Sequence, residues 1–433
     1  LFFEPLTVED VANVVETTGA DRVATQFGGQ TSVNLTVPLQ EYMDRHGIDA
    51  EIAGTAAGDM DAVEDRELFA ERLDEMGIPQ PDSGTATSLA EAERVADEIG
   101  YPLLVRPSYV IGGRAMRVVD SEDELEQYME EAVAVSPDRP VYLDRFLQDG
   151  TELDIDAVSD GDDVLIGGVM EHIEPAGVHS GDSACVLPPQ DVPSDAVETA
   201  TEYVRRIARA FDIQGFLNVQ LAVVEEDGEH EVYVLEANPR ASRTIPFVSK
   251  HADVPLARIA ARVMMGAALD DIDTEPDAGN RVSVKEVVLP FDRLPGSDPS
   301  MSLGPEMKST GEVMGIATDF PTAYYKAQVA AGNALPRGGS ALVVAPGTDV
   351  ADTVDRLRDI GFDVDIRDEP DVDFFRHEYD LIVDLSDTST LKRKAYDENT
   401  PYVSTVQAFD AAVRAIDAVQ DHEPAVAPVD QDR

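Results

Sequence analysis

Two long runs of alternating apolar and polar residues constrain the fold more than any other feature of the sequence. Residues 151–171 read TELDIDAVSDGDDVLIGGVME, and residues 215–240 read GFLNVQLAVVEEDGEHEVYVLEANPR. Each run is interrupted once by Asp-Gly, a dipeptide that favours a tight turn between antiparallel strands. Residues 196–213, between the two runs, carry apolar side chains at helical spacing. The pattern predicts two β-hairpins joined by a helix, within an α+β region.

The segments on either side of this region show α/β patterns. Residues 1–58 alternate between helical and short apolar segments, as in TVEDVANVVETTGADRVATQFGG, where RVATQF predicts a buried strand. Because the chain starts at Leu1, without Met and in mid-pattern, we expect this to be the end of a domain whose first strands are absent. From about Gly338 the strands ALVVAPG and DLIVDLSD alternate with helical segments, which predicts a small parallel α/β domain.

These patterns divide the chain into five segments. A stretch rich in Pro, Gly and Asp marks the exit from the α+β region, and the last residues are again rich in Pro and Asp. We expect the C-terminal part of a first α/β domain (1–58), a large α+β domain (59–270), a connecting segment that completes it (271–337), a small parallel α/β domain (338–420) and a flexible tail (421–433).

Composition limits the classes of function. Hydrophobic residues make up 43% of the 433 residues, so a large core can be buried, and no apolar run is long enough to predict a membrane span. The net charge of −53 disfavours nucleic acid as a partner, because phosphates would be repelled. At molar salt the Debye length falls to about 3 Å, so such an acidic surface favours a salt-rich cytoplasm. The single Cys185 fits a reducing compartment.

Oxygen-bearing side chains mark the end of the second hairpin. The strand VYVL is followed closely by Glu236 and Asn238, and Gln220 lies on the neighbouring strand. One carboxylate combined with other oxygen ligands and phosphate is a typical Mg²⁺ arrangement. A glutamate at a strand end is usually a solvated surface group, but here an Asn, a Pro and two Arg follow it directly. We therefore expect these three side chains to hold a divalent cation.

Two arginines come next, in a chain that is otherwise strongly acidic. Arg240 and Arg243 lie three residues apart. Guanidinium groups clamp carboxylate and phosphoryl oxygens and stabilise the charge that spreads during phosphoryl transfer. The alternative is a pair of surface salt bridges, worth about 0–1 kcal/mol each. Their proximity to the expected metal site favours a small anionic substrate.

A glycine pair is a candidate phosphate-binding segment. Gly112 and Gly113, within RPSYVIGGRAM, would let backbone amides approach a phosphate, with Arg106 and Arg66 adding positive charge. An ordinary hairpin turn explains the same pair. The sequence contains neither a Walker-type phosphate loop nor a GxGxxG segment that opens a helix after a strand.

The loop GVHSGDSAC, residues 177–185, is a second candidate. It places His179 and Ser180 in a polar setting rich in glycine, where the histidine is either structural or a hydrogen-bond donor to phosphate. Cys185 ends the loop without a His–Asp relay to activate it, so we expect a packed core residue and not a nucleophile.

The sequence resembles the large subunit of carbamoyl-phosphate synthase in five ordered motifs. They are DRELFAERLDEMGIPQP, YPLLVRPSYVIGGRAM, EHIEPAGVHSGDSAC, NVQ…LEANPRASRTIPFVSK and LGPEMKSTGEVMG. The resemblance covers about residues 1–335. It is greatest to the C-terminal of the two related ATP-grasp halves in that family's large chain. The resemblance implies an ATP-grasp fold, in which two α+β lobes hold ATP, and phosphorylation of carbamate to give carbamoyl phosphate and ADP.

The same resemblance implies roles for single residues. Those implied to bind the nucleotide are Arg66, Arg106, Gly112, Gly113, Arg145, Leu147, Glu152, Gly177, Val178, His179, Ser180, Gln220 and Glu236, with Arg145, Leu147 and Glu152 at the adenosine end. Those implied to hold Mg²⁺ or Mn²⁺ are Gln220, Glu236 and Asn238. The implied catalytic residues, which would bind carbamate and the transferring phosphoryl group, are Arg240 and Arg243 together with Asn238.

Partners and cellular role also follow from the resemblance. It implies a glutamine amidotransferase small subunit that supplies ammonia, and an N-terminal half of the large subunit that makes carbamate from bicarbonate. It implies arginine and pyrimidine biosynthesis in the cytoplasm. Residues 338–420 resemble the family's methylglyoxal-synthase-like regulatory domain, although its Gly-Thr loop is missing. Two alternatives stay open: another ATP-grasp carboxylate–amine ligase or a biotin carboxylase, and a regulatory module that only binds nucleotide.

Overall fold

The chain forms two compact units, each assembled from separate stretches of sequence. The first consists of Leu1–Pro81, Thr151–Met170 and Asp191–Gly279, and the second of Asp82–Gly150, Glu171–Gln190 and Asn280–Arg433. The computed structural model describes residues 1–107, 116–135, 140–148, 150–226, 228–272, 276–289, 303–305, 307–369, 378–386, 389–421 and 423–426. The predicted phosphate-binding pair Gly112 and Gly113 lies outside these residues. No helix in the described part of the chain is long and apolar enough to cross a membrane.

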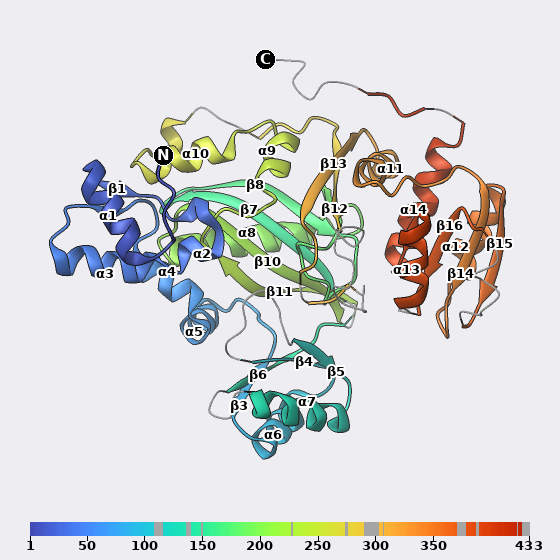
Figure 1. Ribbon diagram of the computed structural model, residues 1–433, viewed down its shortest axis with the longest axis horizontal. Coiled ribbons are helices and arrows are strands. Elements are labelled where there is room, and N and C mark those ends of the chain that lie inside the picture. Colours follow the sequence, from blue (N-terminus) through green and yellow to red (C-terminus); the bar gives the residue numbers. More distant parts are fainter. Residues whose placement is uncertain are drawn as a thin grey trace. The chain divides into compact units, whose positions relative to one another are not determined.

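The first unit is built around four neighbouring strands, in the order β11-β10-β7-β8 (Figure 1). Their bounds are β7 Thr151–Asp160, β8 Val164–His172, β10 Gln214–Glu226 and β11 Glu229–Asn238. β10 pairs antiparallel with both β7 and β11. β7 and β8 are hydrogen-bonded neighbours joined at Asp160-Gly161, so the two predicted hairpins are confirmed, although Asp227 in the second turn is not among the described residues.

The predicted helix between the hairpins is also confirmed, as α8 (Ser194–Ala210). Its Val204 and Ile207 share a hydrophobic core with Ile155, Val219 and Val234 of the strands. Because these strand residues alternate with polar ones, α8 covers one face of the strands (Figure 1). The polar side chains of the alternation lie on the other face.

The N-terminal residues of the first unit form a small parallel sheet with helices. The elements are α1 Val8–Thr18, β1 Arg22–Val23, η1 Gln26–Gly28, α2 Gly29–Val33, α3 Thr36–His46, β2 Glu51–Ile52, α4 Ala57–Glu64 and α5 Arg66–Met76. The predicted strand RVATQF is too long, because only two of its residues pair with β2. The buried side chain of Gln26 bonds to Thr55 Oγ1 and to the Phe216 amide instead, so the chain turns there. The unit also contains α9 Ile245–His251, α10 Leu256–Met264 and η2 Leu269–Asp271.

The second unit begins with an antiparallel sheet in the order β3-β6-β4-β5. Its elements are β3 Ser83–Ala86, α6 Leu89–Ile99, β4 Leu103–Pro107, β5 Arg117–Val119, α7 Glu122–Val135 and β6 Val141–Arg145. A second group of strands follows, β9 Cys185–Leu187, β12 Val282–Val288 and β13 Gly311–Ala317, with β12 pairing antiparallel to both others. Glu171 and His172, the last residues of β8, pair with β9.

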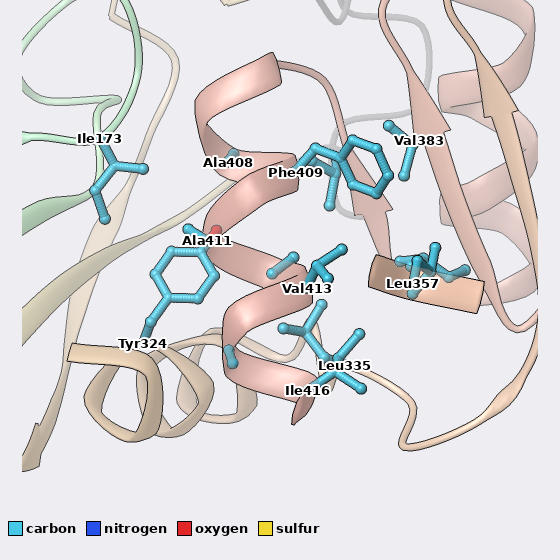
Figure 2. Close-up of a cluster of buried hydrophobic side chains, with 14 of the residues drawn as sticks. Ile173, Tyr324, Leu335, Leu357, Val383, Ala408, Phe409, Ala411, Val413 and Ile416 are labelled. Atoms are coloured by element: carbon cyan, nitrogen blue, oxygen red, sulfur yellow. The ribbon is translucent and has the colours of Figure 1, made fainter. Parts of the chain in front are cut away.

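The C-terminal part of the second unit is the small parallel α/β domain that the sequence predicts. Its strands are β14 Gly339–Val344, β15 Phe362–Arg367, β16 Leu381–Asp384 and β17 Tyr402–Val403, all parallel and in the order β15-β14-β16-β17. Its helices are α12 Ala351–Asp359, α13 Ser389–Glu398 and α14 Val406–Val419. α11 (Phe320–Ala331) shares the core of this domain, where Tyr324 lies beside α14 and its Ala411 (Figure 2).

Candidate active site

One face of the sheet in the first unit carries polar side chains in two cross-strand rows. Directly paired residues, and residues two apart along a strand, point to the same face. The first row is Asp154, Gln220 and Glu236, and the second is Asp156, Asn218 and Asn238. The three predicted metal ligands are therefore brought together on one surface, and two aspartates that the motifs did not single out lie beside them.

A β-bulge sets the direction of Glu236. The register passes from Gln220 opposite Glu236 to Leu221 opposite Val234, so Leu235 is an extra residue on β11. The bulge keeps Val234 in the core while Glu236 points to the polar face. Glu236 is exposed there, and its Oε1 accepts a hydrogen bond of 2.8 Å from Asn238 Nδ2.

Arg240 is held by two amide side chains. Its Nη2 donates to Asn238 Oδ1 at 2.9 Å, and its Nε donates to Gln30 Oε1 at 3.0 Å. Gln30 in turn donates to Glu64 Oε2 at 2.7 Å. Desolvation raises the pKa of the Glu64 carboxyl, while the Gln30 hydrogen bond and the Arg240 charge lower it and the Glu236 charge raises it. Gln30 and Glu64, from the N-terminal segment, are thus part of this cluster, and the motifs gave no sign of them.

Arg243 differs from Arg240, because its side chain is exposed and makes no hydrogen bond or ion pair with any described residue. Arg240 for its part donates to amide oxygens and not to a carboxylate. Neither arginine therefore forms the surface salt bridge that was the alternative explanation, as far as the described residues show. Each guanidinium keeps donors for an anion.

The donor set fits a cation that is shared with a nucleotide. The described residues contain no group of three or more His, Cys, Asp or Glu side chains able to hold a metal. Gln220, Glu236 and Asn238 offer one carboxylate and two amide oxygens. Mg²⁺ retains waters and binds through one or two carboxylates together with substrate phosphates, so it does not need an acidic cage.

Two further predicted nucleotide-binding residues, besides Gln220 and Glu236, lie in the first unit. Arg66 is the first residue of α5, whose start is capped by Asp65 accepting from the Glu67 and Leu68 amides, both at 3.0 Å. Glu152 lies on β7, opposite Ala222 and two residues before Asp154. It therefore shares the polar face with the predicted metal ligands.

In the second unit, three predicted nucleotide-binding residues lie on β4, at the end of β6 and just after β6. Arg106 on β4 lies 3.3 Å from Asp144 Oδ2 through its Nε, and its guanidinium stands 5.7 Å from the centre of the Tyr142 ring. Arg145 ends β6, and the Leu147 side chain after it is buried.

The loop from Gly177 to Ser180 lies directly against that segment. Gly177 has φ +92°, and a Cβ there would stand 2.9 Å from Phe146 Cζ, so glycine is required at this close approach. The Gly181 amide donates to His179 Nδ1 at 2.9 Å, which leaves the imidazole proton on Nε2. The loop is further tied by Lys285, a buried residue whose Nζ donates to the Ser180 carbonyl at 3.2 Å. Val178 is buried within it.

Cys185, at the end of this loop, is fully buried at the start of β9. It pairs with Lys285 of β12 and His172 of β8. The expectation of a packed core residue is therefore confirmed.

Comparison with solved structures identifies the fold. The biotin carboxylase domain of 2-oxoglutarate carboxylase from Hydrogenobacter thermophilus, described in complex with MgADP, ADP and bicarbonate, superposes with a TM-score of 0.59 at 17% identity, covering 77% of this chain and 79% of that one. A biotin carboxylase–β,γ-ATP complex from Campylobacter jejuni gives a TM-score of 0.57 at 16% identity, over 74% and 78% of the two chains. The fold is thus the α/β ATP-grasp fold.

Sequence comparison identifies the family of this chain. Residues 65–272 match the carbamoyl-phosphate synthase L chain ATP-binding domain, and residues 1–62 match the carbamoyl phosphate synthase preATP-grasp domain. The carbamoyl phosphate synthase large chain of Halobacterium salinarum is 54% identical over 431 residues, and that of Methanothrix thermoacetophila is 48% identical over 467. The chain belongs to the carbamoyl-phosphate synthase large-chain family. All of it is covered by these alignments, but it spans only 40% and 43% of the two relatives.

Proposed function

We propose that the chain transfers the γ-phosphoryl group of ATP to carbamate, giving carbamoyl phosphate and ADP, as the second ATP-grasp half of a carbamoyl-phosphate synthase large chain. One observation carries the proposal. Glu236, Asn238 and Arg240 are joined by hydrogen bonds at the end of β11, with the exposed Arg243 just beyond them. A regulatory module that only binds nucleotide would not require two neighbouring guanidinium groups beside an oxygen-rich cation site.

The proposed roles are those that the family resemblance implies for each residue. The nucleotide would be bound by Arg66, Arg106, Gly112, Gly113, Arg145, Leu147, Glu152, Gly177, Val178, His179, Ser180, Gln220 and Glu236. Because Nε2 of His179 carries the proton, that atom would donate to a phosphate oxygen. Gln220, Glu236 and Asn238 would hold Mg²⁺ or Mn²⁺, which when bound neutralises part of the phosphate charge.

The chemistry needs no covalent enzyme intermediate. A carbamate oxygen forms a bond to the γ-phosphorus, the bond from that phosphorus to the β,γ-bridging oxygen breaks, and the electron pair leaves on ADP. Arg240 and Arg243 would orient the carbamate and stabilise charge on the transferring group. Carbamate is labile in water, so exclusion of solvent from the site would protect it.

The wider assignment rests on the family. We propose that residues 1–58, 59–270 and 271–337 form the pre-ATP-grasp end, the ATP-grasp domain and its completing segment, that 338–420 form a methylglyoxal-synthase-like regulatory domain, and that 421–433 form a tail. The partners would be a glutamine amidotransferase small subunit and the N-terminal half of the large subunit. The net charge of −53 supports a salt-rich cytoplasm as the location, where the product would enter arginine and pyrimidine biosynthesis.

The partial reaction in reverse tests the proposal. The purified chain is given carbamoyl phosphate and MgADP, and ATP is assayed. Glu236→Gln should lower the rate at least about 100-fold, because it removes the one carboxylate of the cation site. Glu231→Gln, the same change on the exposed part of β11, should leave it unchanged. An active Glu236→Gln variant would disprove the cation site, and an inactive wild-type chain would disprove the proposed reaction.

A further inference from the structure

The segment that follows β11 is fastened to a buried carboxylate. Asp156 on β7 is fully buried. Its Oδ1 accepts from Ser242 Oγ at 2.7 Å and from Asn218 Nδ2 at 3.0 Å, and its Oδ2 accepts from Thr244 Oγ1 at 2.6 Å. Two of these three donors belong to the stretch that carries the arginines, and none of them has a role in the proposed function.

The remaining attachments of this stretch come from the N-terminal segment. The Ala241 amide donates to the Gln26 carbonyl at 2.9 Å, and the Gln26 side chain is itself fixed by Thr55 and by the Phe216 amide. Arg240 is gripped by Gln30 and Asn238, as described above. Residues 240, 241, 242 and 244 are thus each attached to the body of the unit, and only the Arg243 side chain projects without a partner among the described residues.

We infer that Asp156 is a positioning residue for phosphoryl transfer: through Ser242 and Thr244 it fixes the backbone on both sides of Arg243, so that this guanidinium faces the anionic substrate in one orientation. The inference rests on the proposed function of Arg243. Because Asp156 is fully buried and bonded to Ser242, Thr244 and Asn218, it would act through this segment and not by contact with the substrate. Its effect is to remove conformational freedom from the segment before the substrate arrives, which is how pre-organised groups stabilise a transition state.

Kinetics of ATP formation from carbamoyl phosphate and MgADP separate positioning from general stability. Asp156→Asn keeps the shape of the side chain but loses one acceptor, and Thr244→Val keeps the shape but loses the donor. Each variant should lower kcat and raise the KM for carbamoyl phosphate, so that kcat/KM falls about 10- to 100-fold. The KM for MgADP should stay within about 2-fold. Thr244→Ser keeps the hydroxyl and should restore both constants.

Val158→Ala is the matched control, because Val158 is a fully buried residue two positions along the same strand that makes no bond to the arginine segment. It should lower Tm without changing the KM for carbamoyl phosphate. If Asp156→Asn does not fold, the comparison of Thr244→Val with Thr244→Ser decides the question. If Asp156→Asn or Thr244→Val changes Tm but neither kinetic constant, the carboxylate is purely structural and the inference is wrong.

Hydrogen exchange keeps this test separate from the reaction itself. In the ligand-free chain, peptides covering residues 239–246 should exchange faster in Asp156→Asn and Thr244→Val than in wild type, and not faster in Val158→Ala. This readout would stand even if the wild-type chain formed no ATP, an outcome that would overturn the proposed function alone. Unchanged exchange in both variants would show that Asp156 does not hold the segment.

Discussion

Two groups of buried carboxylates, one in each unit, differ in how their charge is satisfied. In the first unit Asp156 accepts hydrogen bonds from Thr244, Ser242 and Asn218. Burial raises its pKa to about 6, while these donors and the neighbouring Asp154 act in opposite directions on it. A carboxylate with three donors is suited to stay ionised near neutral pH and to hold a loop in place.

In the second unit Glu286 lies near another carboxylate, Glu174. The pKa of Glu286 is raised to about 8: burial is the largest cause and the Glu174 charge adds to it, while the Val287 amide and Lys285 act to lower it. Burial likewise raises the pKa of Glu174 to about 7, against a hydrogen bond from the Ala184 amide. Because Glu286 is buried close to the partly buried Glu174, ionisation of both carboxyls is costly and protonation is favoured. The first group therefore orders a site, and the second links stability to pH.

The largest effect should come from the first unit and should appear in rate alone. Arg243→Ala should lower kcat/KM for ATP formation about 10³-fold, because a guanidinium that stabilises the transferring phosphoryl group is lost. Its Tm should not change, since the side chain has no partner among the described residues. Arg258→Ala, at an exposed position of α10, is the control and should alter neither quantity. A drop in Tm without a loss of rate would reverse the comparison.

In the second unit, a core substitution should instead lower the free energy of unfolding. Tyr324 is 2% exposed and packs beside α14 (Figure 2). Burial raises the pKa of its hydroxyl, and the charge of the nearby Glu286 carboxyl raises it further. Tyr324→Ala should cost about 3–5 kcal/mol in the free energy of unfolding, measured with urea, because it leaves a large cavity. Tyr324→Phe removes only the hydroxyl and should cost about 1 kcal/mol. Equal costs for the two variants would show that the ring packing contributes little.

The same comparison shows what the sequence could predict. The hairpins, the helix between them and the cluster at the end of β11 follow from alternation, because a period of two fixes which side chains share a face. Glu236 and Asn238 are two residues apart, so their shared face was predictable from that alternation. The sequence LDIDAV also held a signal for Asp156, since an acid alternating with core residues must find donors when it is buried.

Other features depend on partners that are far away in the sequence. Gln30 and Arg240 are 210 residues apart, and no local pattern connects them. The strand expected at RVATQF failed for the same reason, because Gln26 bonds to Phe216 across 190 residues. The segment with Gly112 and Gly113 stays a prediction. Long-range hydrogen bonds of single amide side chains are the part of this molecule that periodicity does not encode.

The pH dependence of stability should follow the buried carboxyl of Glu286 and its neighbour Glu174 in the second unit. Glu286 has a folded-state pKa of about 8 against a reference value of 4.5, so the folded chain binds more protons than the unfolded one between these values. Its contribution to stability is therefore full below about pH 4.5 and is lost as the pH rises through 8. Glu286→Gln should flatten the urea-derived stability profile in this window, by at most about 1.4 kcal/mol per pH unit. Glu369→Gln, an exposed change of equal charge, should leave the slope as it is.

The smallest effect is expected where carboxylates are exposed. Arg72 and Glu75 on α5 form an i,i+3 ion pair of 3.0 Å, with side chains 52% and 68% exposed. Arg72→Ala should change the free energy of unfolding by less than about 0.5 kcal/mol, and by still less at molar salt, because water and ions screen the pair. A loss above about 1 kcal/mol would mean that surface pairs matter as much as buried ones. A small loss would indicate that exposed carboxylates contribute little to the stability of this acidic chain. The carboxylates that contribute most would then be the buried ones, which need hydrogen-bond donors or protons.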